Sequence, residues 1–197
     1  MNFTRRNFVK GSSTGLLYLA VGSSLALDGC NVFDDILTWV PIGLTALNGI
    51  VTILGPLVGP GPLVILGLVK AAFADLSAAV SEYKNDTNPT DKATLLAKIR
   101  TFLGDIVSHF QDFLNALNLG NNPIVAIVIG LANIVISAIE GFMGQLPSTG
   151  VTTLTTTLQV GNKSVPIIPK YYKNVNDFKK AYNSFASTNG HPEIVIH

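Results

Sequence analysis

The sequence has little charge, a single cysteine and few histidines, and each scarcity excludes a class of protein. Asp, Glu, Lys and Arg make up 13% of the 197 residues and apolar residues 48%, a balance that excludes an intrinsically disordered chain. The formal net charge of +1 leaves no whole-molecule field to attract nucleic acid. One cysteine excludes an intramolecular disulfide framework and a cysteine-based zinc site.

The sequence also lacks the motifs of most cofactor enzymes. It has no Walker loop, no GxGxxG, no HExxH and no paired histidines for haem or a di-iron centre. We therefore expect no cofactor. Residues 11–15 formally match the GxSxG nucleophile elbow, but that motif needs a strand before it and a helix after it. Here it falls inside an N-terminal leader, so we interpret it as a chance match.

The leader has the organisation of an export signal. Arg5, Arg6 and Lys10 precede an uncharged, Gly- and Ser-rich stretch, residues 11–27, that is too short and too polar for a good membrane span. Together with Phe8, these cations resemble the consensus of bacterial twin-arginine (Tat) signals. The resemblance implies a 1–29 signal peptide, the Tat machinery as a partner, and export in the folded state. The alternative is an ordinary basic N-terminus before a buried helix.

The only cysteine, Cys30, directly follows this stretch. Residues 27–30, Leu-Asp-Gly-Cys, resemble a lipobox, although Asp28 departs from the small neutral residue usual at that site. The resemblance implies that Cys30 is acylated and anchors the chain in a membrane, on the periplasmic side of the cell envelope. Two or three acyl chains give stable anchoring, whereas one does not. Cleavage after Ala26 and an unmodified thiol are the alternatives.

Four long apolar segments, separated by breakers, follow the leader. They span about 35–57, 62–84, 90–119 and 123–146, and Gly59-Pro60-Gly61-Pro62 separates the first two. Their lengths and short connections predict a mainly α fold, an antiparallel four-helix bundle over residues 30–147.

The second and third segments are amphipathic, whereas the first and fourth are more apolar. The third repeats apolar residues every three or four positions, from Leu95 to Leu117. The first and fourth carry only a narrow stripe of small or polar residues: Thr38, Pro41, Thr45, Asn48, Thr52 and Gly55, and Gly130, Asn133, Ser137, Glu140 and Gly144. Such stripes suit central helices of a water-soluble bundle, and we favour that interpretation; membrane insertion stays open as the alternative.

Residues 148–197 form a different appendage. Extended runs on both sides of Gly161-Asn162 predict a small β-hairpin, residues 174–187 a short helix, and residues 193–196 a last strand. Cations exceed acids by three in this appendage, whereas acids exceed cations by four in residues 30–150. Opposite charge favours docking of the appendage on the bundle.

Three groups of residues are candidates for chemistry. Asp105, His109 and Asp112 share one face of the third helix and could hold a metal ion or act as an acid/base pair, although a solvated polar face is the simpler interpretation. His191, Glu193 and His197 would share one face of the last strand. The third group interleaves cations with aromatic rings, a mixture that can bind anionic polymers or glycans: Lys170, Tyr171, Tyr172, Lys173, Lys179 and Lys180.

The helical spacing of Val175, Phe178, Tyr182 and Phe185 instead predicts that most aromatic residues of the appendage belong to its core. No stretch of the mature region resembles a family of known function. We therefore expect a non-catalytic lipoprotein that acts as a structural or binding module. A membrane-active helical protein and an enzyme of unfamiliar type are the alternatives.

Overall fold

The computed structural model of the chain describes residues 29–55, 58–117, 123–147, 157–160 and 163–197. These residues are mainly helical, as the sequence predicts. The elements in chain order are α1 (Gly29–Leu54), α2 (Pro60–Asn85), α3 (Pro89–Ala116), α4 (Pro123–Gln145), β1 (Thr157–Val160), β2 (Lys163–Pro166), α5 (Val175–Thr188) and the 3-10 helix η1 (Pro192–Ile194).

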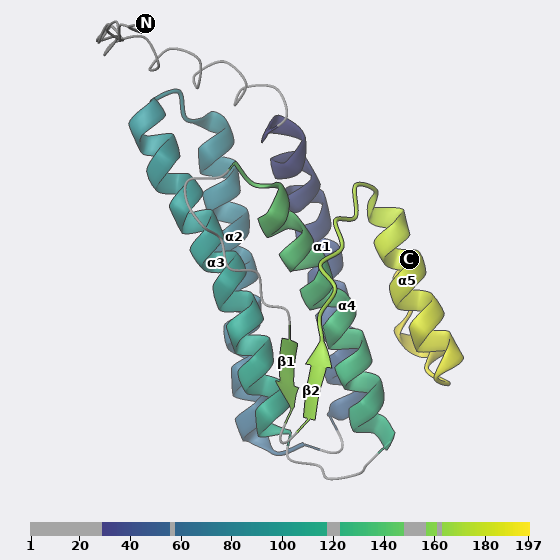
Figure 1. The fold of residues 1–197 in the computed structure, drawn as a ribbon. Coiled ribbons are helices and arrows are strands. Elements are labelled where there is room, and N and C mark those ends of the chain that lie inside the picture. The colour runs from purple at the N-terminus through teal and green to yellow at the C-terminus, as the bar shows by residue number, and fades with distance from the viewer. Residues whose placement is uncertain (1–28, 56–57, 118–122, 148–156, 161–162) are drawn as a thin grey trace, which may run out of the picture.

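The four long helices lie side by side, and consecutive helices run in opposite directions (Figure 1). Helix α2 packs along α3, α1 packs on α2 and α4, and α3 also contacts α4. Helix α5 lies outside this group and contacts α1 and α4. The two most apolar segments of the sequence therefore lie between the other long helices and the C-terminal part of the chain.

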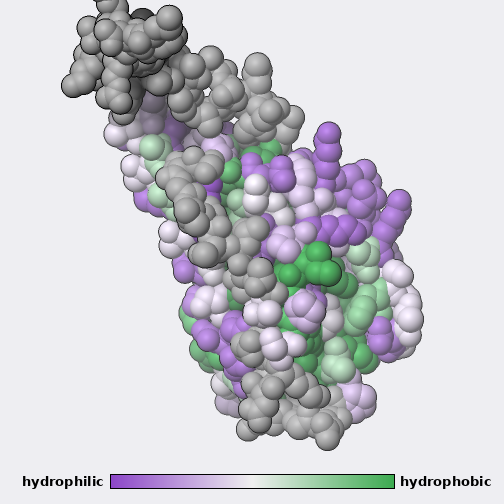
Figure 2. Space-filling model, viewed as in Figure 1, coloured by the Kyte–Doolittle hydropathy of each residue, from purple (hydrophilic) through white to green (hydrophobic). Residues whose placement is uncertain are grey.

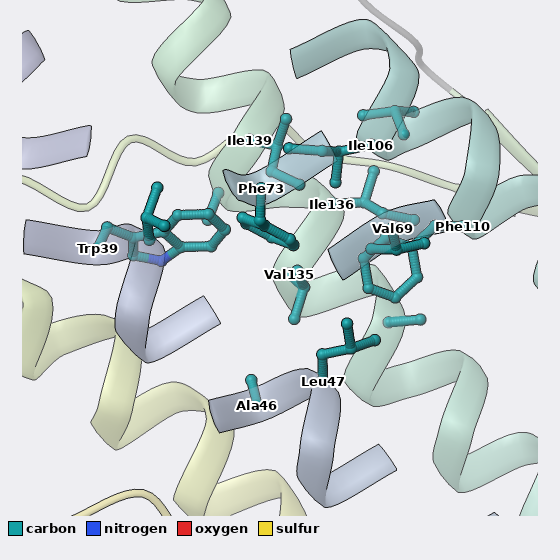
Figure 3. Packing of buried hydrophobic residues seen from close by; sticks show 14 of the residues in the cluster. Trp39, Ala46, Leu47, Val69, Phe73, Ile106, Phe110, Val135, Ile136 and Ile139 are labelled. Carbon is teal, nitrogen blue, oxygen red and sulfur yellow. The ribbon is translucent and has the colours of Figure 1, made fainter. Parts of the chain in front are cut away.

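One continuous apolar core fills the space between the helices. Trp39, Phe73 and Phe110, from α1, α2 and α3, are fully buried or nearly so, and Figure 3 shows them with aliphatic residues of α4 between them. The apolar periodicity of α2 and α3 predicts their buried faces well, since Leu66 to Val80 and Leu95 to Leu117 supply most of the buried positions on those two helices. Burial of this kind is the dominant favourable contribution to folding.

Two helix starts differ from the prediction. Helix α1 begins at Gly29 rather than near residue 35, because Val32 and Phe33 pack in the core and extend the buried face by a turn. Helix α2 begins at Pro60 rather than at Pro62. Proline is tolerated there because the first-turn N–H groups of a helix have no partner inside the helix.

The C-terminal elements are confirmed only in part. Strands β1 and β2 pair antiparallel over four residues each, with Thr157 opposite Pro166, which is shorter than the expected hairpin; its predicted turn lies outside the described residues. Helix α5 begins at Val175, close to the predicted start, and the Asn174 side chain caps it by accepting a hydrogen bond from the N–H of Asn176. The predicted last strand is wrong: residues 192–194 form η1, which starts at Pro192, a residue that suits a first helical turn and cannot donate to a strand ladder.

The small and polar stripes of α1 and α4 have different surroundings. On α1 the stripe is exposed, and the hydroxyls of Thr38, Thr45 and Thr52 each donate to the carbonyl four residues earlier at 2.9 Å. On α4 the stripe is largely buried or half-buried, and Glu140 is the one charged residue that is buried in the described part of the chain. Three positions of the α4 stripe, Gly130, Asn133 and Ser137, contact residues of the C-terminal part of the chain.

Candidate functional site: the seam between the C-terminal segment and helices α1 and α4

Residues 163–197, here called the C-terminal segment, pack against one side of α1 and α4, and we call this contact the seam. The segment turns an apolar face inward: Ile167, Tyr172, Phe178, Tyr182, Ala186, Ile194 and Ile196 are all buried. Its outward face is polar, and Figure 2 shows hydrophilic residues gathered where Figure 1 places the start of α5. The segment thus gives α1 and α4 a hydrophilic cover on this side.

On α4 the seam depends on positions that have no side chain. A Cβ atom on Gly141 would lie 2.4 Å from the main chain of Lys170 and Tyr171, and one on Gly130 would lie 2.1 Å from the ring of Phe185. Between these two glycines, the carbonyl of Ser137 accepts a hydrogen bond of 2.8 Å from the N–H of Lys170. The C-terminal segment therefore packs on the side of α4 that carries the small and polar stripe predicted from the sequence.

On α1 the seam is formed around Tyr182. Its hydroxyl donates to the carbonyl of Ala46 at 2.9 Å, and it lies so close to Gly49 that a Cβ atom there would be 2.8 Å from the phenolic oxygen. Burial raises the pKa of Tyr182 above its ordinary value. The ring of Phe178 meets Trp39 edge to face with 5.4 Å between centroids. Trp39, the only tryptophan of the chain, therefore lies at the seam.

Hydrogen bonds fold the chain end back onto α5. The side chain of Asn183 accepts from the N–H of Ile196 at 2.7 Å and donates to its carbonyl at 2.9 Å. The Lys179 ammonium donates to the carbonyl of His197 at 2.6 Å. These bonds hold Ile194 and Ile196 against the bundle, where both are buried.

Charged groups lie at the end of the bundle where α1 begins. The Tyr171 hydroxyl donates to the carboxylate of Asp35, and Lys84 of α2 pairs with Asp34. Burial and the hydrogen bond to Asp35 raise the pKa of Tyr171 to about 12. A hollow of about 420 Å³ lies beside this contact and is lined by Asp35, Thr38, Trp39, Tyr172, Lys173, Asn174 and Val175.

The structure divides the basic and aromatic candidates between the seam and the surface. Tyr172 is buried and Tyr171 half-buried, so their rings pack in the seam. Lys170 lies over the ring of Tyr172, 4.7 Å from its centroid, and Lys179 is half-buried. Lys170, Lys173 and Lys180 are exposed, the last 3.8 Å from Asp177. Within this group only lysine side chains are exposed where a polymer could contact them, and their role in binding stays a prediction.

The other two candidate groups do not form a shared site. Asp105 and His109 are half-buried and Asp112 is exposed; in the described residues no three His, Cys, Asp or Glu side chains are grouped to hold a metal ion. Their use as an acid/base pair stays a prediction.

His191 and Glu193 form a pair with 2.7 Å between ring nitrogen and carboxylate, and this hydrogen bond lowers the pKa of Glu193. The main chain of His197 accepts the bond from Lys179, and residues 192–194 form η1, so the three residues of this group do not share a strand face.

The residues of the signal motif, Arg5, Arg6, Phe8 and Lys10, lie outside the described residues. Cys30 is described in its main chain, as part of the first turn of α1.

No protein-family model, no curated protein and no solved structure matches the chain. The functional argument therefore depends on the residues themselves.

Proposed function

We propose that the chain is exported and anchored in the cell envelope as a non-catalytic lipoprotein, in which residues 30–147 form an antiparallel four-helix bundle with the short hairpin and α5 docked on it. The bundle would act as a structural or binding module on the periplasmic side. The observation that carries this proposal is the position of Cys30 in the first turn of α1.

This position would join the lipid anchor to the bundle without an intervening linker. The adjoining helix ends carry charged residues, among them Asp34 and Lys84, which suit the polar headgroup region rather than the hydrocarbon core. The opposite end of the bundle has far less charge, since no charged residue occurs between Asp35 and Lys70 or between Asp112 and Glu140. The bundle would then hold its apolar end away from the anchoring membrane.

Labelling with radioactive palmitate in a Gram-negative host tests the anchor. We expect label in the wild-type chain and none in Cys30→Ala. Replacing both Arg5 and Arg6 by lysine should leave an unprocessed precursor in the cytoplasm. Label that persists in Cys30→Ala, or a mature mass that fits cleavage after Ala26, would contradict lipidation at this residue.

A membrane-active helical protein is the second candidate, and one observation favours it. Helices α1, α2 and α4 are each long and apolar enough to cross a membrane. On α2, moreover, Leu63, Val64 and Leu68 are 37%, 66% and 48% exposed. Alkaline carbonate extraction of a leaderless Cys30→Ala chain separates the candidates: release into the supernatant contradicts spanning helices, and retention in the membrane pellet contradicts the lipid anchor as the sole attachment.

A further inference from the structure

We propose that the face of α1 and α4 beneath the C-terminal segment is a lipid-binding surface, and that an anionic bilayer uncovers it by drawing the segment away. This inference rests on the second candidate function, association of the apolar helices with a membrane, and is independent of acylation at Cys30. The first step of the argument concerns what the segment covers. Helices α1 and α4 are both candidate membrane spans, and α5 packs on these two helices.

The surface under the segment has the polarity that a lipid surface requires. Two of the hydrogen bonds across the seam, from the Tyr182 hydroxyl and the Lys170 N–H, end on the carbonyls of Ala46 and Ser137. Both carbonyls lie inside helices, where the N–H four residues on is their regular donor. Separation of the segment would therefore leave no orphan carbonyl on either helix, which is the condition for contact with hydrocarbon.

Few polar side chains lie on this surface, and one of them, Asn133, donates its amide N–H to the carbonyl of Pro166 in the segment at 3.4 Å. The Ser137 hydroxyl donates to the side-chain oxygen of Asn133 at 3.4 Å, within α4. The carboxylate of Asp35 lies near the end of α1, where it would stay at the headgroup level. Glycines 49, 130 and 141 make the rest of the surface smooth, so acyl chains could approach the helices closely.

The charge distribution identifies an anionic bilayer as the competitor for the segment. Five lysines and two acids give residues 148–197 a formal charge of +3, whereas residues 30–150 carry −4. The segment also donates a hydrogen bond to a bundle carboxylate, from the Tyr171 hydroxyl to Asp35. The charge attraction between segment and bundle adds to the apolar packing of the seam, and a surface dense in anionic lipid competes for the same lysines.

A reversible lock on the seam tests the proposal. A Cβ atom on Gly49 would lie 3.2 Å from the Cβ of Ile194, close to the roughly 3.5–4.5 Å that a disulfide spans. The full chain carrying Cys30→Ala, Gly49→Cys and Ile194→Cys should thus form one disulfide on oxidation. That bond ties the end of the segment to α1, and reduction releases it. Failure of the bond to form would contradict the seating of Ile194 on α1.

Trp39 supplies the readout, because it is the only tryptophan, is 1% exposed, and contacts Phe178 across the seam. Vesicles of phosphatidylcholine and phosphatidylglycerol with brominated acyl chains should quench Trp39 in the reduced protein, with at least a twofold loss of emission. The oxidised protein should lose little, and brominated vesicles of phosphatidylcholine alone should quench neither form. Equal quenching of both forms, or of neither in anionic vesicles, would overturn the proposal.

A second pair of variants tests the same proposal without the engineered disulfide, in case that disulfide perturbs folding. In the Cys30→Ala chain, Gly141→Ala places a methyl group against the main chain of residues 170–171, whereas Gly104→Ala on α3 meets nothing within 4 Å. We expect the first to be quenched at a lower content of anionic lipid than the second. Flotation of the vesicles measures membrane association separately. If protein floats with the vesicles but Trp39 is quenched equally in the oxidised and reduced forms, the proposal of a covered lipid-binding surface is contradicted. If no protein floats, membrane association itself is contradicted.

Discussion

Glycines at the seam affect stability because other groups of the chain pack where a side chain would be. Gly141 faces the main chain of Lys170 and Tyr171, which cannot rotate out of the way as a side chain can. Gly104 occupies an equally helical position with open space around it. The two glycines therefore have opposite effects on stability when a methyl group is added.

We predict that Gly141→Ala lowers the free energy of unfolding by about 1–3 kcal/mol, the usual cost of overpacking. Gly104→Ala should instead raise it by up to about 1 kcal/mol, because alanine is the better helix former. Urea unfolding followed by circular dichroism measures both. A Gly141→Ala chain as stable as the Gly104→Ala chain would contradict the close seating of the segment on α4.

The tyrosine hydroxyls of the seam make stability depend on alkaline pH. The pKa of Tyr171 rises from 10.0 to about 12 and that of Tyr182 is also raised, so the folded state favours the neutral phenols. Below about pH 10 their contribution to stability is fully present; as the pH rises from 10 toward 12 the unfolded chain loses these protons first, and stability falls.

We expect the free energy of unfolding to fall over that interval, and to fall less steeply in Tyr171→Phe and Tyr182→Phe. Unfolding by urea at a series of pH values measures the slope, and spectrophotometric titration of tyrosinate reports the ionisation itself. An unchanged slope in both variants would show that these phenols titrate alike in the folded and unfolded chains.

At the scale of helices, the effect of a proline on stability depends on its position in the helix. Pro41 lies inside α1 and is exposed, whereas Pro60 occupies the first turn of α2. An interior proline removes a helical hydrogen bond and crowds the preceding turn, and a first-turn proline does neither. We predict that Pro41→Ala stabilises the fold by about 1–3 kcal/mol.

The matched change Pro60→Ala should alter stability by less than about 0.5 kcal/mol. Thermal unfolding of the two variants under the same conditions makes the comparison. Equal effects of the two substitutions would contradict the start of α2 at Pro60 or the continuity of α1 through Pro41.

The helices could be predicted from sequence because their apolar positions repeat at helical spacing. Most positions of the predicted stripe from Leu95 to Leu117 are buried, while tertiary packing also buries residues beside it, among them Leu96 and Leu103. The start at Gly29 could not be predicted, since it depends on tertiary contacts that bury Val32. The start at Pro60 also differs from the prediction, although Pro60 and Gly61 are exposed and no burial explains it. The prediction of a last strand was wrong for a local reason, because Pro192 favours a helical turn.

The candidate site was visible in the sequence only as an unexplained pattern. The spacing of Gly130, Asn133 and Ser137 marks a small and polar stripe on α4. A pattern of this kind does not say whether lipid, another helix or an irregular segment covers it. That answer depends on the close approach of residues 170–171 to Gly141, and Gly141 itself lies beside the predicted stripe.

For the whole molecule, the apolar residues are buried in two ways, within the group of long helices and beneath the C-terminal segment. Helices α2 and α3 turn apolar faces inward, and the C-terminal segment supplies the polar cover that α1 and α4 lack at the seam. The same arrangement gives the molecule one end with charged residues next to Cys30 and another with little charge. Anchoring and lipid binding would then use different parts of one fold.

The fluorescence of Trp39 during unfolding tests this account most directly, because its side chain contacts aromatic rings of α2, α4 and α5 at once. In detergent-free buffer we predict emission shielded from acrylamide, lost on heating in the same transition as the helical circular dichroism signal. Emission open to acrylamide before any helix melts, or a Trp39 transition separate from that of the helices, would contradict the packing of the apolar helices under the C-terminal segment.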